Sequence, residues 1–182
     1  DFPDLQFVFT PASYTEGMIG KLQDHPGITC GVWQSRPQSR GYIRATSNNI
    51  KIDPIIQPNY LKEKIDQDIL IEGVKMCRKL LKTSNIEKIS VNETLPGEHV
   101  KTNNEILNFV RNNGATVYHA IGSCKMGVDQ SAVVNPSLKI LGLENIRVAD
   151  ASIMPTMPSG NTNAATLMIA EKASDLIKKD LN

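Results

Sequence analysis

The longest helical period in the sequence does most to constrain the fold. Between residues 62 and 82, apolar side chains recur every three or four positions, which places them in neighbouring rows along one side of a helix. These rows are Ile69, Gly73, Met76 and Leu80, and Leu70, Val74, Cys77 and Leu81. A helix with one apolar side needs a second layer of secondary structure to cover it.

Three short runs before this helix are typical of β-strands. Residues 5–10 are rich in Phe and Val and lie between two prolines, and 28–34 and 41–46 are joined by a turn-like segment. We expect these strands to share one antiparallel sheet. We expect the helix to pack on one face of that sheet through Ile69, Val74, Met76 and Leu80.

Two further helices are predicted downstream. One begins at about Thr102 or Asn103 and ends at Arg111, before an Asn-Gly stop, and the other starts after Asn161 and continues to Lys179 with basic residues at its end. Strands followed by helices, without regular βαβ alternation, indicate an α+β fold with an antiparallel sheet and packed helices. We divide the chain into two parts, 1–117 and 118–182.

Composition excludes several functional classes. With 40% hydrophobic and 21% charged residues, the sequence is typical of an ordinary globular protein. A net charge of +1, with lysines scattered among acids, gives no field that would attract nucleic acid. The apolar stretches fall far short of the roughly 20 residues that span a bilayer. We therefore expect no nucleic-acid partner and no membrane span.

The cysteines argue against a metal centre. Cys30, Cys77 and Cys124 lie far apart with no C-x-x-C spacing, which suits neither a zinc site nor a disulfide framework. Unpaired cysteines are typical of a reducing compartment, and we expect a cytoplasmic protein.

One histidine stands apart from the other two. His119 lies between apolar residues and a Gly-Ser turn, so the backbone can bend and present the ring at a cavity. Histidine is also common as an ordinary core or surface residue. His25 and His99 lie beside turn residues, and we expect both to be exposed.

Two other short segments allow a structural and a functional interpretation. Asn161 and Thr162 precede a helical run, so either can simply cap the helix, yet a helix N-terminus also offers unpaired N–H groups and partial positive charge. Asp150 and Ala151 follow a short strand, 146–149, where an Asp side chain often bonds to its own backbone in a turn.

Four ordered segments of the sequence resemble the glucose–methanol–choline (GMC) oxidoreductases. They are YHAIGSCKMG (118–127), NPSLKILGL (135–143), IRVADASIMP (146–155) and PSGNTNAAT (158–166), and residues 35–41 and 53–60 are similar to the start of the family's C-terminal module. The resemblance covers about residues 35–178. It implies that 1–117 belong to the substrate-binding part, and that 118–182 carry the catalytic histidine and return to the FAD domain.

The resemblance also implies a reaction and residue roles. FAD would oxidise the CH–OH group of a small alcohol, with His119 as the base and Asn161 as a hydrogen-bond donor to the substrate oxygen. Many family members carry a second histidine at the latter position, and asparagine is typical of the choline-type branch. The backbone at Asp150 and Ala151 would contact the cofactor, and Thr162 and Asn163 would lie at the helix end that faces the flavin. The alcohol and the electron acceptor stay open.

The family's phosphate-binding turn, G-x-G-x-x-G, is missing from the sequence. This chain alone should therefore not hold FAD tightly and should be inactive by itself. It would need an N-terminal FAD-binding portion, either in a longer polypeptide or in a second subunit. Two alternatives are a non-catalytic binding subunit with the same fold and, less favoured, a fatty-acid photodecarboxylase relative. That branch carries cysteine where this sequence has Ser35.

Overall fold

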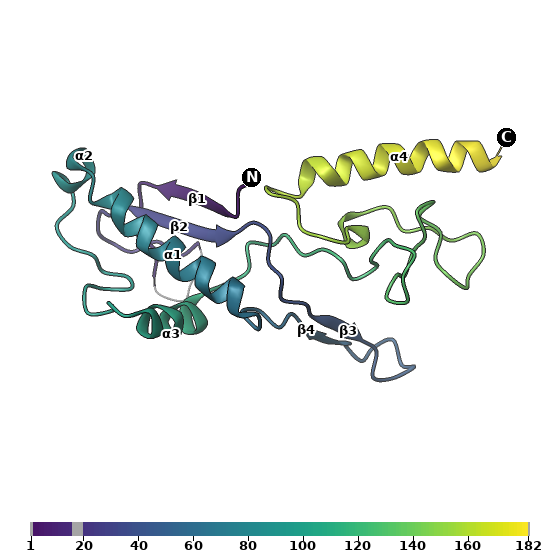
Figure 1. Cartoon of the computed structure of the whole chain (residues 1–182), viewed down its shortest axis with the longest axis horizontal. Helices are drawn as coiled ribbons and strands as arrows, with labels where there is room; N and C mark the ends of the chain where they lie inside the picture. Colours follow the sequence, from purple (N-terminus) through teal and green to yellow (C-terminus); the bar gives the residue numbers. More distant parts are fainter. Residues whose placement is uncertain (1, 16–19, 182) are drawn as a thin grey trace. The chain divides into compact units, whose positions relative to one another are not determined.

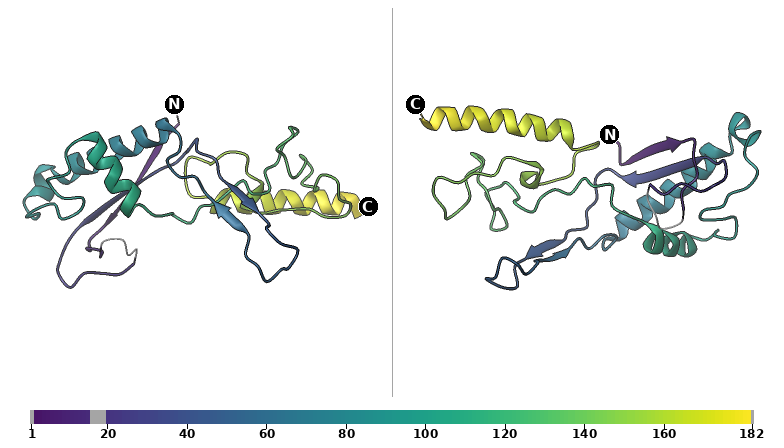
Figure 2. Two further views of the ribbon diagram at one scale, coloured as in Figure 1. Left: turned by 90° about the horizontal axis from the view of Figure 1, so that it is seen from below. Right: turned by 180° about the vertical axis from the view of Figure 1, so that it is seen from behind.

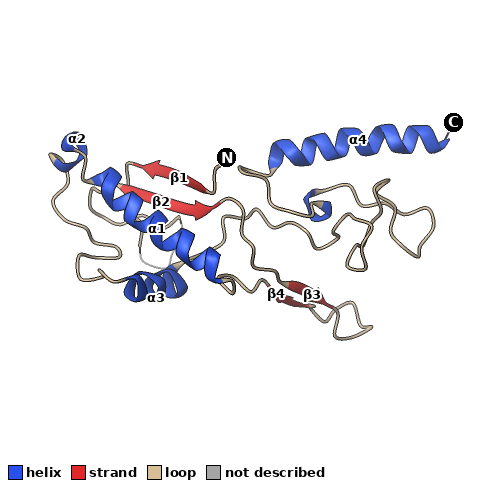
Figure 3. Ribbon diagram, in the orientation of Figure 1, coloured by secondary structure: helices blue, strands red, loops and turns tan. Residues whose placement is uncertain are grey.

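The computed structural model describes residues 2–15 and 20–181, and its helices and strands are coloured in Figure 3. In chain order (Figure 1) the elements are β1 (Leu5–Thr10), β2 (Thr29–Gln34), β3 (Tyr42–Arg44), β4 (Ile55–Gln57), α1 (Lys64–Leu81), α2 (Ser84–Glu87), α3 (Asn103–Asn113), a short 3-10 helix η1 (Ala151–Ile153) and α4 (Asn163–Leu181). Small antiparallel sheets with packed helices confirm the α+β class and the three predicted helices.

The chain forms two compact units. The first contains residues 1–40 and 59–117, and the second contains 41–58 and 118–182. The segment 41–58 therefore clusters with the C-terminal unit, although it precedes the boundary at 117 in the sequence. The substrate-binding and catalytic roles assigned above to the two parts of the chain remain predictions.

The first unit is built on a hairpin covered by α1. Strands β1 and β2 pair antiparallel, from Leu5 opposite Gln34 to Thr10 opposite Thr29. Helix α1 lies along this hairpin (Figure 1) and packs against it at Gly73. A Cβ atom on Gly73 would lie 3.0 Å from Val32 Cγ2, so a larger residue would push the helix away from the strand.

The prediction of one three-stranded sheet is wrong. Strand β3 pairs with β4 in a separate antiparallel hairpin, which Figure 2 shows from two further sides. The segment between β2 and β3 does not close a turn back along β2, because the N–H groups of Gln38 and Ser39 donate to the carboxylate of Asp66 at 2.8 and 2.7 Å. The extended stretch before Pro58 supplies the partner of β3 instead.

The contact face predicted for α1 is only partly correct. Ile69 is half-buried and Val74 packs against a small core that α1 shares with α3, but Met76 and Leu80 are 45% and 43% exposed. The buried residues of the helix are Asp66, Ile71, Gly73 and Cys77. Gly73 and Cys77 belong to the predicted apolar rows, but Asp66 does not, because an apolar period leaves out an aspartate.

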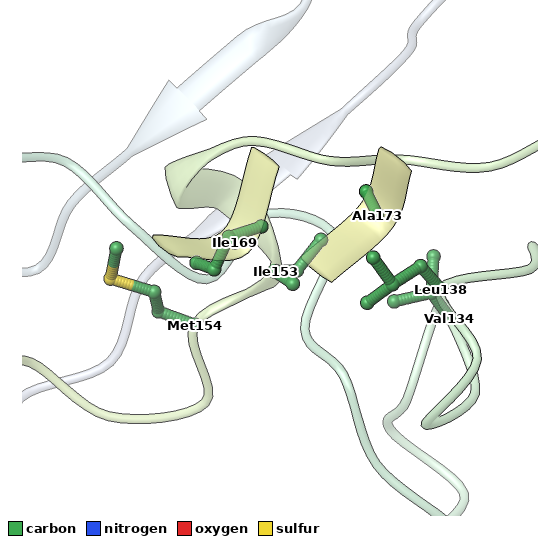
Figure 4. Packing of buried hydrophobic residues seen from close by; sticks show 6 residues of the cluster. All are labelled: Val134, Leu138, Ile153, Met154, Ile169 and Ala173. Atoms are coloured by element: carbon green, nitrogen blue, oxygen red, sulfur yellow. The ribbon is translucent and has the colours of Figure 1, made fainter. Parts of the chain in front are cut away.

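The core of the second unit joins α4 to irregular backbone. Its buried members are Val134, Leu138, Ile153, Met154, Ile169 and Ala173 (Figure 4). At the C-terminal end of α4, Asp180 forms ion pairs with Lys139 and Arg147, both at 2.6 Å. Within the residues that the structure describes, no helix is both long enough and apolar enough to cross a membrane.

Candidate active site

The ring of His119 lies between two side chains at the start of α4. Asn161 Nδ2 is 2.8 Å from His119 Nε2, and Thr162 Oγ1 is 3.2 Å from His119 Nδ1. An amide nitrogen can only donate, so with this orientation of the Asn161 amide Nε2 is the acceptor. The proton of the neutral ring then lies on Nδ1, which donates to the Thr162 hydroxyl oxygen.

Two bends in the backbone present His119 to this site. Tyr118 has a φ of 62° and Gly122 a φ of 81°, so left-handed residues flank the histidine on both sides. Beyond the second bend, Cys124 N donates to Ser152 O at 3.0 Å. The histidine segment is thereby fixed to the turn that carries the predicted cofactor residues Asp150 and Ala151.

Thr162, the residue before α4, directs its side-chain hydroxyl to the ring of His119. The Thr162 carbonyl accepts from Thr166 N at 2.9 Å, which is the first hydrogen bond of the helix. Its hydroxyl, on a side chain that is only 8% exposed, is directed to His119 instead. Asn163 is the first residue of α4. The partial positive charge of the helix N-terminus therefore lies beside the His119–Asn161 pair.

The pair is accessible to solvent. Asn161 is exposed and His119 is half-buried. In the same unit, Ile153, Met154 and Ile169 belong to the buried core. Because Asn161 is exposed, a ligand can approach the pair from solvent.

Asp150 has the local role that its turn position favours. Its carboxylate oxygen accepts from Ser152 N at 2.7 Å and caps η1. Hydrogen bonds from the hydroxyl and the backbone N–H of Ser152 hold the pKa of Asp150 below its ordinary value. Any contact with a cofactor would therefore come from the backbone of Asp150 and Ala151.

Not every predicted site residue is brought together. His119, Asn161 and Thr162 are in direct contact, Asn163 follows them, and Asp150 and Ala151 lie in the adjoining turn. Sequence reasoning missed the bond from Thr162 to the ring, and the one available signal was its position beside Asn161. His25 and His99 are exposed, as predicted. Across residues 2–15 and 20–181, no three metal-binding side chains cluster.

A family profile described as GMC oxidoreductase matches residues 37–170. The chain is 41% identical over 182 residues to an alcohol dehydrogenase [acceptor] of Pseudomonas putida, covering all of this chain and 33% of the relative. It is also 41% identical over 179 residues to human mitochondrial choline dehydrogenase, covering 97% of this chain and 30% of the relative. The chain therefore belongs to the GMC oxidoreductase family and matches the family's C-terminal portion.

Solved structures agree with this assignment. Pyridoxine 4-oxidase from Mesorbium loti superposes with a TM-score of 0.85 at 27% identity, over 95% of this chain and 34% of that one. An FAD-dependent oxidoreductase from Chaetomium thermophilum gives a TM-score of 0.79 at 27% identity, over 85% and 27% of the two chains. The chain thus spans about a third of the length of the curated relatives that it matches.

Proposed function

We propose that this chain is the catalytic C-terminal portion of an FAD-dependent enzyme that oxidises the CH–OH group of a small alcohol. The observation that carries the proposal is the His119–Asn161 pair at the N-terminus of α4. It combines a proton acceptor and a hydrogen-bond donor 2.8 Å apart, next to the positive end of a helix.

A hydroxyl group is chemically suited to this pair. An alcohol O–H can donate to His119 Nε2 while its oxygen accepts from Asn161 Nδ2, so a substrate would replace one direct hydrogen bond by two. Nε2 then takes the hydroxyl proton, and the amide stabilises the negative charge that develops on the oxygen. A positioned base of this kind contributes about 10² to 10⁴ in rate.

Thr162 supports the tautomer in which Nε2 acts as the base. Because the Nδ1–H group donates to its hydroxyl oxygen, the lone pair of the ring stays on Nε2, where the substrate would lie. After proton transfer both ring nitrogens carry hydrogen, and Nδ1 keeps its partner. Thr162 is therefore a positioning residue for His119.

The cofactor can be accommodated only in part by this chain. The N-terminus of α4 suits a carbonyl on which negative charge accumulates, and the turn at Asp150 and Ala151 offers backbone groups. The residues that would contact FAD are Asp150, Ala151, Thr162 and Asn163. FAD supplies the acceptor for the hydride that leaves the alcohol carbon. Its pyrophosphate needs a glycine-rich turn that this sequence lacks, so an N-terminal portion must provide it.

The test is anaerobic stopped-flow reduction of bound flavin in the full-length protein that contains this chain. A panel of primary, secondary and quaternary-ammonium alcohols is mixed with the protein, and flavin absorbance is followed. We expect at least one alcohol to bleach the flavin in a saturable manner. If dithionite reduces the flavin but none of the alcohols does, the chain belongs to a non-catalytic relative and the proposal is wrong.

A further inference from the structure

Two of the three cysteines face each other across the interface between β2 and α1, in the first unit. Alternate residues of a strand point to the same side, so Gln34, Val32 and Cys30 share one face of β2. That face meets α1, because Gln34 Nε2 donates to Asp66 Oδ1 at 2.9 Å and Val32 packs against Gly73. The strand and the helix therefore run past each other in opposite directions.

The spacing along both elements places Cys30 opposite Cys77. Cys30 lies two strand residues beyond Val32, about 6.6 Å along β2. Cys77 lies four helix residues beyond Gly73, about 6 Å along α1. These two distances are nearly equal, so Cys30 and Cys77 should lie opposite each other in the same way as Val32 and Gly73. Consistent with this register, Cys30 is the neighbouring group that, after burial, contributes to raising the pKa of Cys77.

The two thiols differ in exposure. Cys77 is buried, at 7% exposed, and Cys30 is half-buried. Burial, together with the neighbouring Cys30 thiol, raises the pKa of Cys77 to about 12. Cys77 is therefore protonated at neutral pH, and a soluble reagent reaches Cys30 first.

We propose that Cys30 and Cys77 form a peroxide-responsive dithiol that closes to an intrachain disulfide between β2 and α1. In the first step the Cys30 sulfur attacks one oxygen of hydrogen peroxide, the O–O bond breaks, and the other oxygen leaves as water with the Cys30 proton. Cys30 becomes a sulfenic acid. In the second step the Cys77 sulfur attacks the Cys30 sulfur, and the hydroxyl leaves as water with the Cys77 proton. Both sulfurs are oxidised, and both peroxide oxygens are reduced to water.

The test maps the disulfide in the folded, unsubstituted protein. The full-length protein that contains this chain is titrated with hydrogen peroxide, its remaining thiols are alkylated, and a tryptic digest is analysed without reductant. Trypsin separates the three cysteines into peptides 22–40, 76–78 and 112–125. We expect peptides 22–40 and 76–78 to be recovered as one cross-linked species that dithiothreitol separates, and 112–125 to be recovered alkylated.

Matched variants test the assignment of the two cysteines. Cys124→Ser should form the same cross-link, whereas Cys30→Ser and Cys77→Ser should not. In Cys77→Ser, Cys30 should be recovered as a sulfenic acid that dimedone traps, because its resolving thiol is missing. The proposal is overturned if peroxide drives Cys30 of the unsubstituted protein to sulfinic acid without a cross-link. A cross-link between Cys124 and either of the other cysteines would also overturn it.

Discussion

Asn161 Nδ2 lies 2.8 Å from His119 Nε2, so the donor and the acceptor of the candidate active site satisfy each other directly. A ligand that enters between them must offer both a hydrogen-bond donor and an acceptor on one small group, which a hydroxyl does. Under the proposed function, this relationship would favour an alcohol as substrate and would give the two residues different roles.

The first prediction concerns the base. Replacing His119 with Ala removes the proton acceptor, so the rate of flavin reduction in the full-length enzyme should fall by about 10² to 10⁴. Anaerobic stopped flow with a substrate alcohol measures this rate. His99→Ala is the matched control, because His99 is exposed, and it should keep the parent rate. A folded, flavin-loaded His119→Ala enzyme that reduces flavin at the parent rate would show that His119 is not the base.

The second prediction separates the effect of losing the hydrogen-bond donor at position 161 from the effect of placing a negative charge there. Asn161→Asp keeps the size of the side chain but places a carboxylate beside Nε2, where it favours the protonated ring. The acidic limb of the pH–rate profile for flavin reduction should move to higher pH by about 1 to 3 units. Asn161→Ala loses the donor without adding charge, so its rate should fall by about 10² to 10³ with no comparable move of the limb. If the acidic limbs of the parent and Asn161→Asp profiles superimposed, the contact between Asn161 and His119 would be contradicted.

The third prediction concerns Thr162 as a positioning residue. Thr162→Val keeps the shape of the side chain and leaves the Nδ1 proton of His119 without an acceptor, at a cost of about 1 to 3 kcal/mol. We expect flavin reduction to slow by about 10-fold to 100-fold, with little change in the apparent dissociation constant of the substrate. Thr162→Ser restores the hydroxyl and should recover most of the rate. A serine variant as slow as the valine variant would point to packing in place of the hydrogen bond.

The helices could be predicted from local sequence, and the strand pairing could not. Thr102 and Glu105 form the capping box that begins α3, and both partners lie within four residues of one another. The segment that leads into β3 is held instead by bonds from Gln38 and Ser39 to Asp66, which follows them by more than 25 residues. The local periodicity of apolar residues carries no information about a hydrogen bond between residues so far apart in the sequence.

The candidate site shows the same division. His119 was identified by its turn context and by resemblance, and its bond to Asn161 joins residues 42 positions apart. Asp66 was missed as a buried residue because a carboxylate looks like a solvent-exposed side chain until its donors are known. The opposite error concerns Met76 and Leu80, which were predicted to be buried and are exposed. Apolar character alone does not bury a side chain.

The fourth prediction follows from Asp66, which is 1% exposed. Burial alone would raise the pKa of Asp66, but hydrogen bonds from Gln38, Ser39 and Gln34 outweigh it and hold the pKa below the ordinary 3.8. In Asp66→Asn, an amide N–H group would face these donors, so the free energy of unfolding should fall by about 1 to 3 kcal/mol at neutral pH.

The same pKa direction determines how this difference depends on pH. A depressed pKa means that the carboxylate stabilises the fold above the unfolded value, and that this contribution is lost as pH falls through the folded value. Urea unfolding should therefore show a gap between the parent and Asp66→Asn that is full at pH 7 and narrows below about pH 4. Asp68→Asn, on the exposed side of the same helix, should change stability little. A gap that stays constant down to pH 2 would contradict the assignment.

The fifth prediction concerns FAD binding by the 182-residue chain alone. Under the proposed function the N-terminus of α4 and the turn at Asp150 would contact the flavin, but a dinucleotide is held chiefly at its pyrophosphate by a glycine-rich turn, which is missing from this sequence. The chain, incubated with excess FAD and passed through gel filtration, should elute without flavin absorbance, while circular dichroism shows that it is folded. The same chain joined to an N-terminal portion that carries a G-x-G-x-x-G turn should retain the cofactor. If the isolated, folded chain emerged yellow with one FAD per molecule, α4 and the Asp150 turn would suffice for binding. The proposal that an N-terminal portion must bind the pyrophosphate would then be wrong.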